Sequence, residues 1–198
     1  YMVSGSYKES DDNIYLFRRN SSTPLWSYHT TYSGDGDYVY DVSISANGDY
    51  IAASSADDCV YLFGKDNSTP IWYYVTGNQA YSVEISPAGD YIVAGSVDRK
   101  VYFFGRNNNT PYWSYTSSAN LFGLGVSNTG EYVAAGSRAQ SSGKVYMFNN
   151  DNLSDEQENT LPVISAIHVT PESALLNQEV YFSADISDSD GYVVEFEW

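Results

Sequence analysis

Apolar and polar residues alternate in short segments along most of the 198-residue chain, and turn residues separate these segments. Four consecutive examples are "AYSVEIS" (80–86), "DYIVAGS" (90–96), "KVYFF" (100–104) and "PYWSYT" (111–116). Each is rich in β-branched and aromatic residues and is bounded by Gly, Asn, Asp, Ser or Pro. No helical periodicity is found in residues 1–149. The pattern predicts short β-strands in succession and an all-β fold.

This group of four strands recurs with a period of about 41 residues. Tyrosines follow a turn glycine at Tyr50, Tyr91 and Tyr132, and a second set stands in the third strand at Tyr15, Tyr61, Tyr102 and Tyr146. Four short strands in a unit of about 40 residues are typical of a β-propeller blade. The second strands carry small residues that suit a strand covered on both faces by neighbouring blades: Ala52, Ala53, Ala94 and Gly95.

The segment "SVEISPAGDYIVAGSVDRKVYFF" (82–104) resembles a WD-type repeat. The residues that match its pattern are Ser96, Asp98 and Val101, and again Ser55, Asp57 and Val60. The Trp-Asp pair of that family is replaced by Phe104-Gly105 and Phe63-Gly64, and its usual histidine is absent. We therefore expect the hydrogen-bond network that joins WD blades to be incomplete here.

The segment "TPIWYYVTG" (69–77) resembles instead the repeat of pyrroloquinoline-quinone-type propellers. In that family a tryptophan of the outer strand packs against the adjacent blade. The resemblance implies this role for Trp26, Trp72 and Trp113.

In this phase the chain opens on the second strand of a blade, and complete blades follow at about 38–76 and 80–117. The last blade supplies three strands, so residues 1–149 are predicted to form a partial propeller of about 3.5 blades. Propellers have about 4–8 blades, and we therefore expect further blades upstream. The outer strand missing from the last blade would come from that upstream segment and close the ring.

Residues 150–160 are predicted to be an acidic linker, and 161–198 to be the N-terminal part of a truncated β-sandwich. This last segment resembles the start of a PKD-type immunoglobulin-like domain, with a proline-led strand, "EVYF", "DSDG" and Trp198. The carboxylates of Asp188 and Asp190 are weak candidates for a Ca²⁺ site. Asp, Ser and Gly are also ordinary turn residues, and we favour a turn.

The formal charge of −16 argues against nucleic acid or an anionic membrane surface as a partner. No apolar stretch approaches the roughly 18 residues of a spanning helix, so no membrane insertion is predicted. The single cysteine, Cys59, excludes an internal disulfide. Because Asn13, Lys100 and Lys144 hold its place in the other repeats, Cys59 is predicted to be exposed.

Loop lengths differ between repeats in only two places. The turn between the first and second strands and the turn between the third and fourth are constant. The loop between the second and third strands is three residues longer at 7–13 and at 138–144 than at "VDRK" (97–100), and the connection between blades gains five residues within 31–40. In a propeller these two variable loops emerge on the same face. Insertions that gather on one face suggest a recognition surface.

We therefore hypothesise a binding surface on that face. Its tyrosines would supply rigid contact area, and its carboxylates a preference for cationic or hydroxylated ligands. An unselected set of surface insertions is the alternative. The candidate residues are Tyr7, Glu9, Asp11, Tyr32, Asp35, Asp37, Arg138 and Gln140.

No Gly-x-Ser-x-Gly motif is present, and one cysteine cannot form the cysteine pair of some quinoproteins. We expect no cofactor and a non-enzymatic extracellular or cell-surface scaffold that binds protein or carbohydrate. The resemblance to PKD-type modules, which commonly act as spacers or adhesive units in extracellular proteins, implies this location. The alternative is the propeller portion of a secreted hydrolase or quinoprotein whose catalytic residues lie elsewhere. Sequons at Asn20, Asn67, Asn108 and Asn152 fit an extracellular location, although turn preference also produces such matches.

Overall fold

The computed structural model describes residues 1–7, 13–30, 38–138 and 143–150 fully, and near the C-terminus the backbone of three further strands. The described part of the chain contains β-strands and no helices, which confirms the predicted all-β class. The strands of the first half are β1 (Met2–Gly5), β2 (Asn13–Phe17), β3 (Pro24–His29), β4 (Val39–Ile44), β5 (Tyr50–Ser55), β6 (Cys59–Gly64) and β7 (Pro70–Val75). Those of the second half are β8 (Ala80–Ile85), β9 (Tyr91–Ser96), β10 (Lys100–Gly105), β11 (Trp113–Thr116), β12 (Asn120–Val126), β13 (Tyr132–Arg138), β14 (Lys144–Asn149), β15 (Val163–Thr170), β16 (Tyr181–Ser187) and β17 (Tyr192–Glu197).

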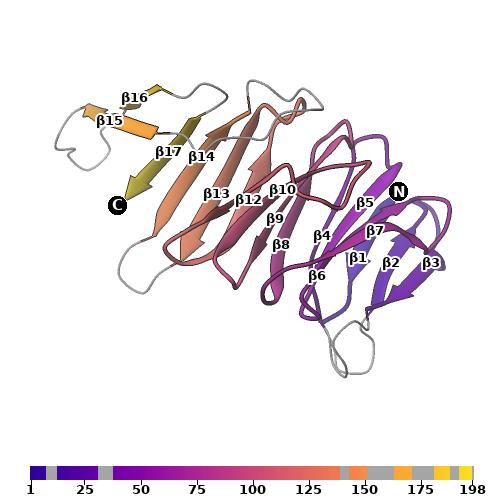
Figure 1. Cartoon of the computed structure of the whole chain (residues 1–198). Helices are drawn as coiled ribbons and strands as arrows, with labels where there is room; N and C mark the ends of the chain where they lie inside the picture. Colours follow the sequence, from indigo (N-terminus) through magenta and orange to yellow (C-terminus); the bar gives the residue numbers. More distant parts are fainter. Residues whose placement is uncertain are drawn as a thin grey trace, which may run out of the picture.

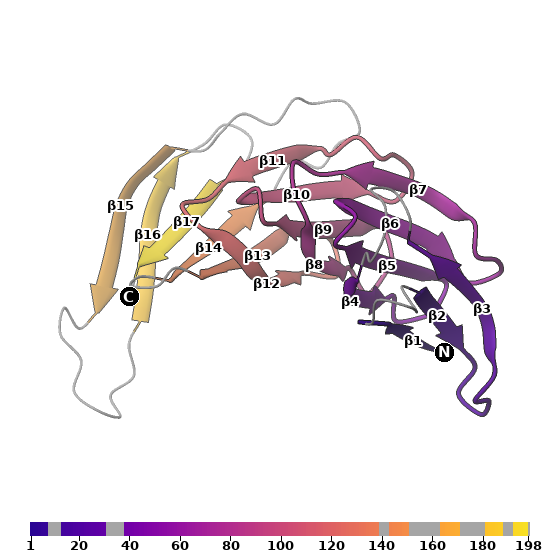
Figure 2. The same ribbon diagram turned by 90° about the horizontal axis from the view of Figure 1, so that it is seen from below.

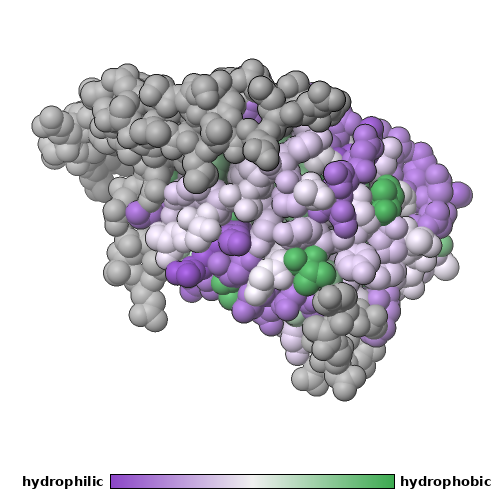
Figure 3. Space-filling model, in the orientation of Figure 1, coloured by the Kyte–Doolittle hydropathy of each residue, from purple (hydrophilic) through white to green (hydrophobic). Residues whose placement is uncertain are grey.

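Apart from β15 and β16, the strands form four antiparallel sheets in the orders β1-β2-β3, β4-β5-β6-β7, β8-β9-β10-β11 and β12-β13-β14-β17. The sheets stand side by side (Figure 1) and fan out along an arc (Figure 2). The first strands β4, β8 and β12 lie on the concave side of the arc, and the outer strands β3, β7 and β11 lie on the convex side. The four sheets are consistent with propeller blades, as the repeat predicts. In the orientation of Figure 3 the described surface is mostly hydrophilic, with a few separate hydrophobic groups.

The fourth position of the last sheet differs from the expectation that an upstream segment supplies it. Strand β17 pairs there with β14, from Lys144 opposite Glu197 to Asn149 opposite Tyr192. Without a neighbouring strand this edge of β14 would present unpaired N–H and C=O groups, and any extended segment within reach can satisfy them. Strands β15 and β16 form a separate two-stranded sheet. The domain boundaries and the PKD-type sandwich stay predictions.

Small residues let neighbouring sheets approach closely, as predicted. Ala52, Ala53 and Ala94 are fully buried. A Cβ added to Gly95 would lie 2.8 Å from Ser82 Oγ and 3.0 Å from Leu121 Cβ in the next sheet. The second strands β5 and β9 are therefore packed closely against their surroundings, as in a propeller.

The tryptophans of the outer strands join each sheet to the next, which confirms their predicted role. Each indole N–H donates to an oxygen of the following sheet or its end: Trp26 to Lys65 O (2.9 Å), Trp72 to Arg106 O (2.7 Å) and Trp113 to Asn150 Oδ1 (2.8 Å). Each ring also packs on a phenylalanine of that sheet, with ring centroids 5.4, 5.3 and 4.7 Å apart at Phe63, Phe104 and Phe148. This row of tryptophans holds the outer ends of the sheets together.

The prediction that Cys59 is exposed is wrong, because its side chain is fully buried. It packs with Val39, Ile51 and Tyr61 between two sheets. Lys100, at the equivalent position, is half-buried, since a long side chain can carry its charge out to water. Burial and the nearby Asp57 carboxylate raise the pKa of Cys59 to about 12, so its thiol stays protonated.

Two aspartates of the WD-like pattern organise the turns between second and third strands. Asp57 accepts hydrogen bonds from Cys59 N (3.0 Å) and from the Tyr61 hydroxyl. Asp98 accepts from Lys100 N (2.8 Å), from the Tyr102 hydroxyl and from Gly77 N (2.9 Å). A tyrosine of the third strand is thus the buried donor to each aspartate. The carboxylate ties its turn to the adjacent strand.

Candidate binding surface

A β-bulge interrupts the first strand of each of three sheets. The pairing of β4 with β5 shifts between Val39 and Asp41, and β8 and β12 show the same shift at equivalent places. The extra residues are Tyr40, Tyr81 and Phe122, which lie 41 residues apart. A bulge re-aims the side chain of its extra residue, so one aromatic ring leaves the regular alternation in each sheet.

These re-aimed rings meet across the sheets. Tyr40 and Tyr81 stack with ring centroids 4.5 Å apart, and Tyr81 meets Phe122 edge-on at 4.6 Å. Tyr7, which follows β1, lies 5.9 Å from Tyr40 and stacks on Tyr38 at 4.3 Å. We call the five side chains Tyr7, Tyr38, Tyr40, Tyr81 and Phe122 the aromatic ladder.

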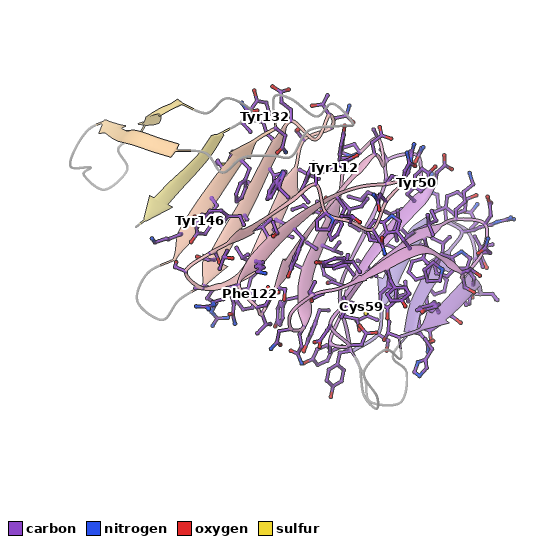
Figure 4. All side chains as sticks on the ribbon, viewed as in Figure 1. Tyr50, Cys59, Tyr112, Phe122, Tyr132 and Tyr146 are labelled. Atoms are coloured by element: carbon purple, nitrogen blue, oxygen red, sulfur yellow. The ribbon has the colours of Figure 1, made fainter. Side chains whose placement is uncertain are left out.

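The ladder lies on the face that the loop lengths single out. Its residues flank the connections that enter the first strands and, for Tyr7, the loop that leaves a second strand. Figure 4 places Phe122 and Cys59 along one edge of the sheets, and Tyr50, Tyr112 and Tyr132 along the opposite edge. Tyr7 is 68% exposed, and the other four rings are half-buried. The ladder therefore presents aromatic surface to solvent.

Two carboxylates lie beside the ladder on the same first strands. Asp41 accepts hydrogen bonds from Val42 N (2.9 Å) and from Val83 N of the next sheet (3.1 Å). Burial raises the pKa of Asp41 in spite of these bonds. Burial, and secondly the charge of Asp41, raise the pKa of Glu84. The two groups thus form a partly buried acidic pair next to the rings.

Tyr40 has a polar partner within the ladder region, because its hydroxyl donates to Gln79 Oε1 at 3.1 Å. Burial, followed by the neighbouring tyrosines Tyr7, Tyr81 and Tyr38, raises the pKa of Tyr40. Its phenol is therefore neutral at physiological pH.

Two of the predicted binding residues lie at opposite ends of the ladder. Tyr7 forms one end, and the guanidinium of Arg138 lies 5.9 Å from the ring centroid of Phe122 at the other. The structure brings them together through the intervening rings. The remaining candidates lie outside the described residues and stay predictions: Glu9, Asp11, Tyr32, Asp35, Asp37, Gln140 and, for the metal site, Asp188 and Asp190.

Sequence reasoning missed Tyr38, Tyr40, Tyr81 and Phe122. A signal for three of them is present, since an aromatic residue recurs every 41 positions near the start of a first strand, at Tyr40, Tyr81 and Phe122. Regular alternation assigns such a residue to one face of its strand. Only the register shift shows that the ring turns toward its equivalents in the neighbouring sheets.

On the opposite face, charged side chains are paired with other groups of the protein. Lys65 pairs with Asp49, and Arg106 pairs with Asp90 at 2.9 Å while its guanidinium lies 4.6 Å from the ring centroid of Tyr50. The glycines of these turns have positive φ, and the ring of Tyr50 would lie 2.7 Å from a Cβ at Gly89. Side chains from one sheet thus close the turns of the next.

A groove of about 570 Å³ lies at the rim, between β7 and residues 107–109, where Asn109 Nδ2 donates to Tyr73 O (3.1 Å). Among the described residues, no group of three His, Cys, Asp or Glu side chains is placed to bind a metal ion. The same part of the chain has no helix long and apolar enough to cross a membrane.

Comparison with known families agrees with the strand pattern. The WD40 repeat (WD domain, G-beta repeat) matches residues 26–63 and 73–104. Residues 26–104 hold WD40 repeats. Each matched WD40 unit begins in the outer strand of one sheet and ends in the third strand of the next, so the sequence unit itself spans two sheets.

WD40 repeats are generally non-catalytic scaffolds that bind proteins, and no catalytic family matches the chain. No curated protein matches it either. What the WD40 match gives is therefore the repeat type. The aromatic ladder is a feature of this chain's own geometry.

Proposed function

We propose that this protein is a non-enzymatic binding scaffold whose aromatic ladder recognises a partner protein. The observation that carries the proposal is the bulge in three successive first strands, which aims one aromatic ring per sheet onto a common face. A bulge interrupts the backbone ladder and leaves one residue unpaired. Its repetition at the same place supports a shared purpose for the three rings.

The properties of the ladder suit recognition. Tyrosine and phenylalanine supply large, rigid contact area, and tyrosine is frequent among residues that dominate binding energy. The described residues near the ladder add the carboxylates of Asp41 and Glu84 and the guanidinium of Arg138. Aromatic surface with charged groups at its margins is the usual composition of a protein-binding patch.

A glycan is the second candidate ligand, because tyrosine rings and carboxylates also suit a hydroxylated partner. The acidic composition and the resemblance of residues 161–198 to a PKD-type domain support an extracellular or cell-surface location. An alternative role, as the propeller portion of a secreted hydrolase or quinoprotein, requires catalytic residues outside this chain.

The test is affinity capture from an extract of the source organism, with glycan-array binding in parallel. The immobilised chain is compared with the variant Tyr40→Leu/Tyr81→Leu, which removes two rings and keeps apolar volume. The matched control is Tyr73→Leu, which changes a 47% exposed tyrosine on the outer strand β7. We expect the ladder variant to lose a captured protein, or a bound glycan, that the wild type and the control retain. Identical binding by all three proteins would refute the proposal.

A further inference from the structure

One end of the ladder already holds a cation. The guanidinium of Arg138 lies 5.9 Å from the ring centroid of Phe122, within the range of a cation–π interaction. A second guanidinium, that of Arg106, lies 4.6 Å from the ring centroid of Tyr50 on the opposite face. The protein therefore uses arginine over an aromatic ring twice within its own fold. These contacts are internal examples of the chemistry that the ladder can offer to a partner.

The surroundings of the ladder favour positive charge. Asp41 and Glu84 are partly buried carboxylates on β4 and β8, close enough for the charge of one to act on the other. Two like charges held together are relieved by a cation that approaches them. The whole chain, with a formal charge of −16, would also attract a basic partner over longer distances.

Two of the protein's cationic side chains form ion pairs on the other face. Lys65 and Arg106 form ion pairs with Asp49 and Asp90 in the turns between first and second strands. They therefore do not supply the counter-charge for Asp41 and Glu84. A cation from a partner could fill that role.

From these contacts we propose that the aromatic ladder binds an extended basic segment of a partner protein, with arginine or lysine side chains held against Tyr40 and Tyr81. The inference rests on the proposed function and deepens it by naming the chemistry of the partner. Successive ring centroids from Tyr7 through Tyr40 and Tyr81 to Phe122 are 5.9, 4.5 and 4.6 Å apart. A peptide of about five extended residues has this length. Arg138 closes the Phe122 end and would repel a cation placed there, so it limits the basic segment to the tyrosines.

The experiment uses fluorescein-labelled heptapeptides in which three arginines alternate with serine. Matched probes replace every arginine with citrulline, which keeps the shape and loses the charge, or with glutamate. Chitotetraose serves as a neutral oligosaccharide probe. We expect the arginine peptide to bind at least about tenfold more tightly than the citrulline peptide, since one desolvated cation–π contact contributes on the order of a tenfold change. The glutamate peptide is expected to bind more weakly still.

The variants assign the binding to the ladder. Tyr40→Leu/Tyr81→Leu is expected to weaken arginine-peptide binding at least about tenfold, whereas Tyr73→Leu leaves it unchanged. Arg138→Gln is expected to strengthen it severalfold, because it removes the repelling charge. Circular dichroism and the thermal midpoint establish that each variant is folded.

The outcomes separate this inference from the proposed function. If the citrulline peptide or chitotetraose binds as well as the arginine peptide and depends on Tyr40 and Tyr81, the ladder is a binding site but not one for cations. If the arginine peptide binds equally to the ladder variant, or not at all to the wild type, the inference is likewise overturned. The proposed function falls only if the capture and glycan experiments also show no dependence on the ladder.

Discussion

Two rows of aromatic side chains cross the sheets of this protein. In only one of them do all the side chains find their partners within the protein. The tryptophan row on the outer strands gives each indole N–H an oxygen in the next sheet and each ring a phenylalanine to pack on. The ladder on the first strands stacks ring on ring and remains half-exposed, with Tyr7 exposed at its end. Both rows follow the sequence repeat.

The difference lies in the local backbone. The outer strands begin at a proline or tryptophan and keep their tryptophans on the side that faces the next sheet. In the first strands a bulge places the aromatic residue outside the pairing register. A repeat can therefore use the same residue class for structure at one strand and for display at another.

The largest effect is expected from Trp72→Ala in the tryptophan row. Trp72 is 8% exposed, packs on Phe104 and donates to Arg106 O. Loss of this packing should lower the free energy of unfolding by about 3–5 kcal/mol, measured by urea denaturation. Tyr73→Ala, one residue away on the exposed side of β7, is the control and should cost far less. Equal losses would mean that the tryptophan row does not hold the sheets together.

A second pair of variants compares hydroxyl groups rather than rings. The hydroxyl of Tyr61 donates to the fully buried Asp57, so Tyr61→Phe leaves a buried carboxylate short of a donor. We expect a loss of about 1–3 kcal/mol in the free energy of unfolding. Tyr81→Phe in the ladder should change stability by less than about 0.5 kcal/mol. A stability cost at Tyr81 as large as that at Tyr61 would contradict the conclusion that the ladder is displayed to solvent and is not part of the packed interior.

The ladder itself should matter little for folding. Tyr40→Leu/Tyr81→Leu removes one stacked pair and keeps much of the apolar volume, and the expected cost is about 1 kcal/mol. The measurement is the thermal midpoint, read beside the capture experiment on the same protein. Unfolding of this variant at room temperature would show that the rings are structural.

The smallest effect concerns pH. Because the pKa of Glu84 is raised in the folded state, the folded protein retains this proton at pH values where the unfolded chain has released it. Stability from this group is therefore complete below the ordinary pKa and decreases as pH rises through the folded value. Glu84→Gln should make unfolding less pH-dependent above the ordinary pKa of a glutamate, by less than about 1 kcal/mol because solvent screens the half-buried carboxylate. A steeper pH dependence in this variant would show that Glu84 is stabilised as an anion.

Much of the scaffold could be predicted from particular residues. The tyrosines after each turn glycine and in the third strands predicted the strand order of the blades. The resemblance to pyrroloquinoline-quinone-type repeats implied the role of Trp26, Trp72 and Trp113. The same alignment failed at Cys59. Cys59 and Lys100 hold equivalent positions in the repeat, but the small thiol is fully buried, whereas the long side chain of lysine can carry its charge out to water.

Only part of the aromatic ladder could be expected from the sequence. The loop insertions indicated the face on which it lies and two residues at its ends, Tyr7 and Arg138, whose role in binding stays a prediction. They did not reveal Tyr40, Tyr81 and Phe122, which belong to the strands. Alternation along a strand assigns each residue to one face of the sheet. The extra residue of a β-bulge reverses that assignment, and the amino-acid composition does not reveal the bulge.

The sequence by itself determined the all-β class, the repeating unit and the packing tryptophans, because strand propensity, turn residues and period are local properties of the chain. Only the tertiary structure decided that Tyr40, Tyr81 and Phe122 form one continuous row with Tyr7 and Arg138 at its ends. That arrangement depends on the register between strands and on the distance between sheets. Both are set by pairing and packing among residues far apart in the chain.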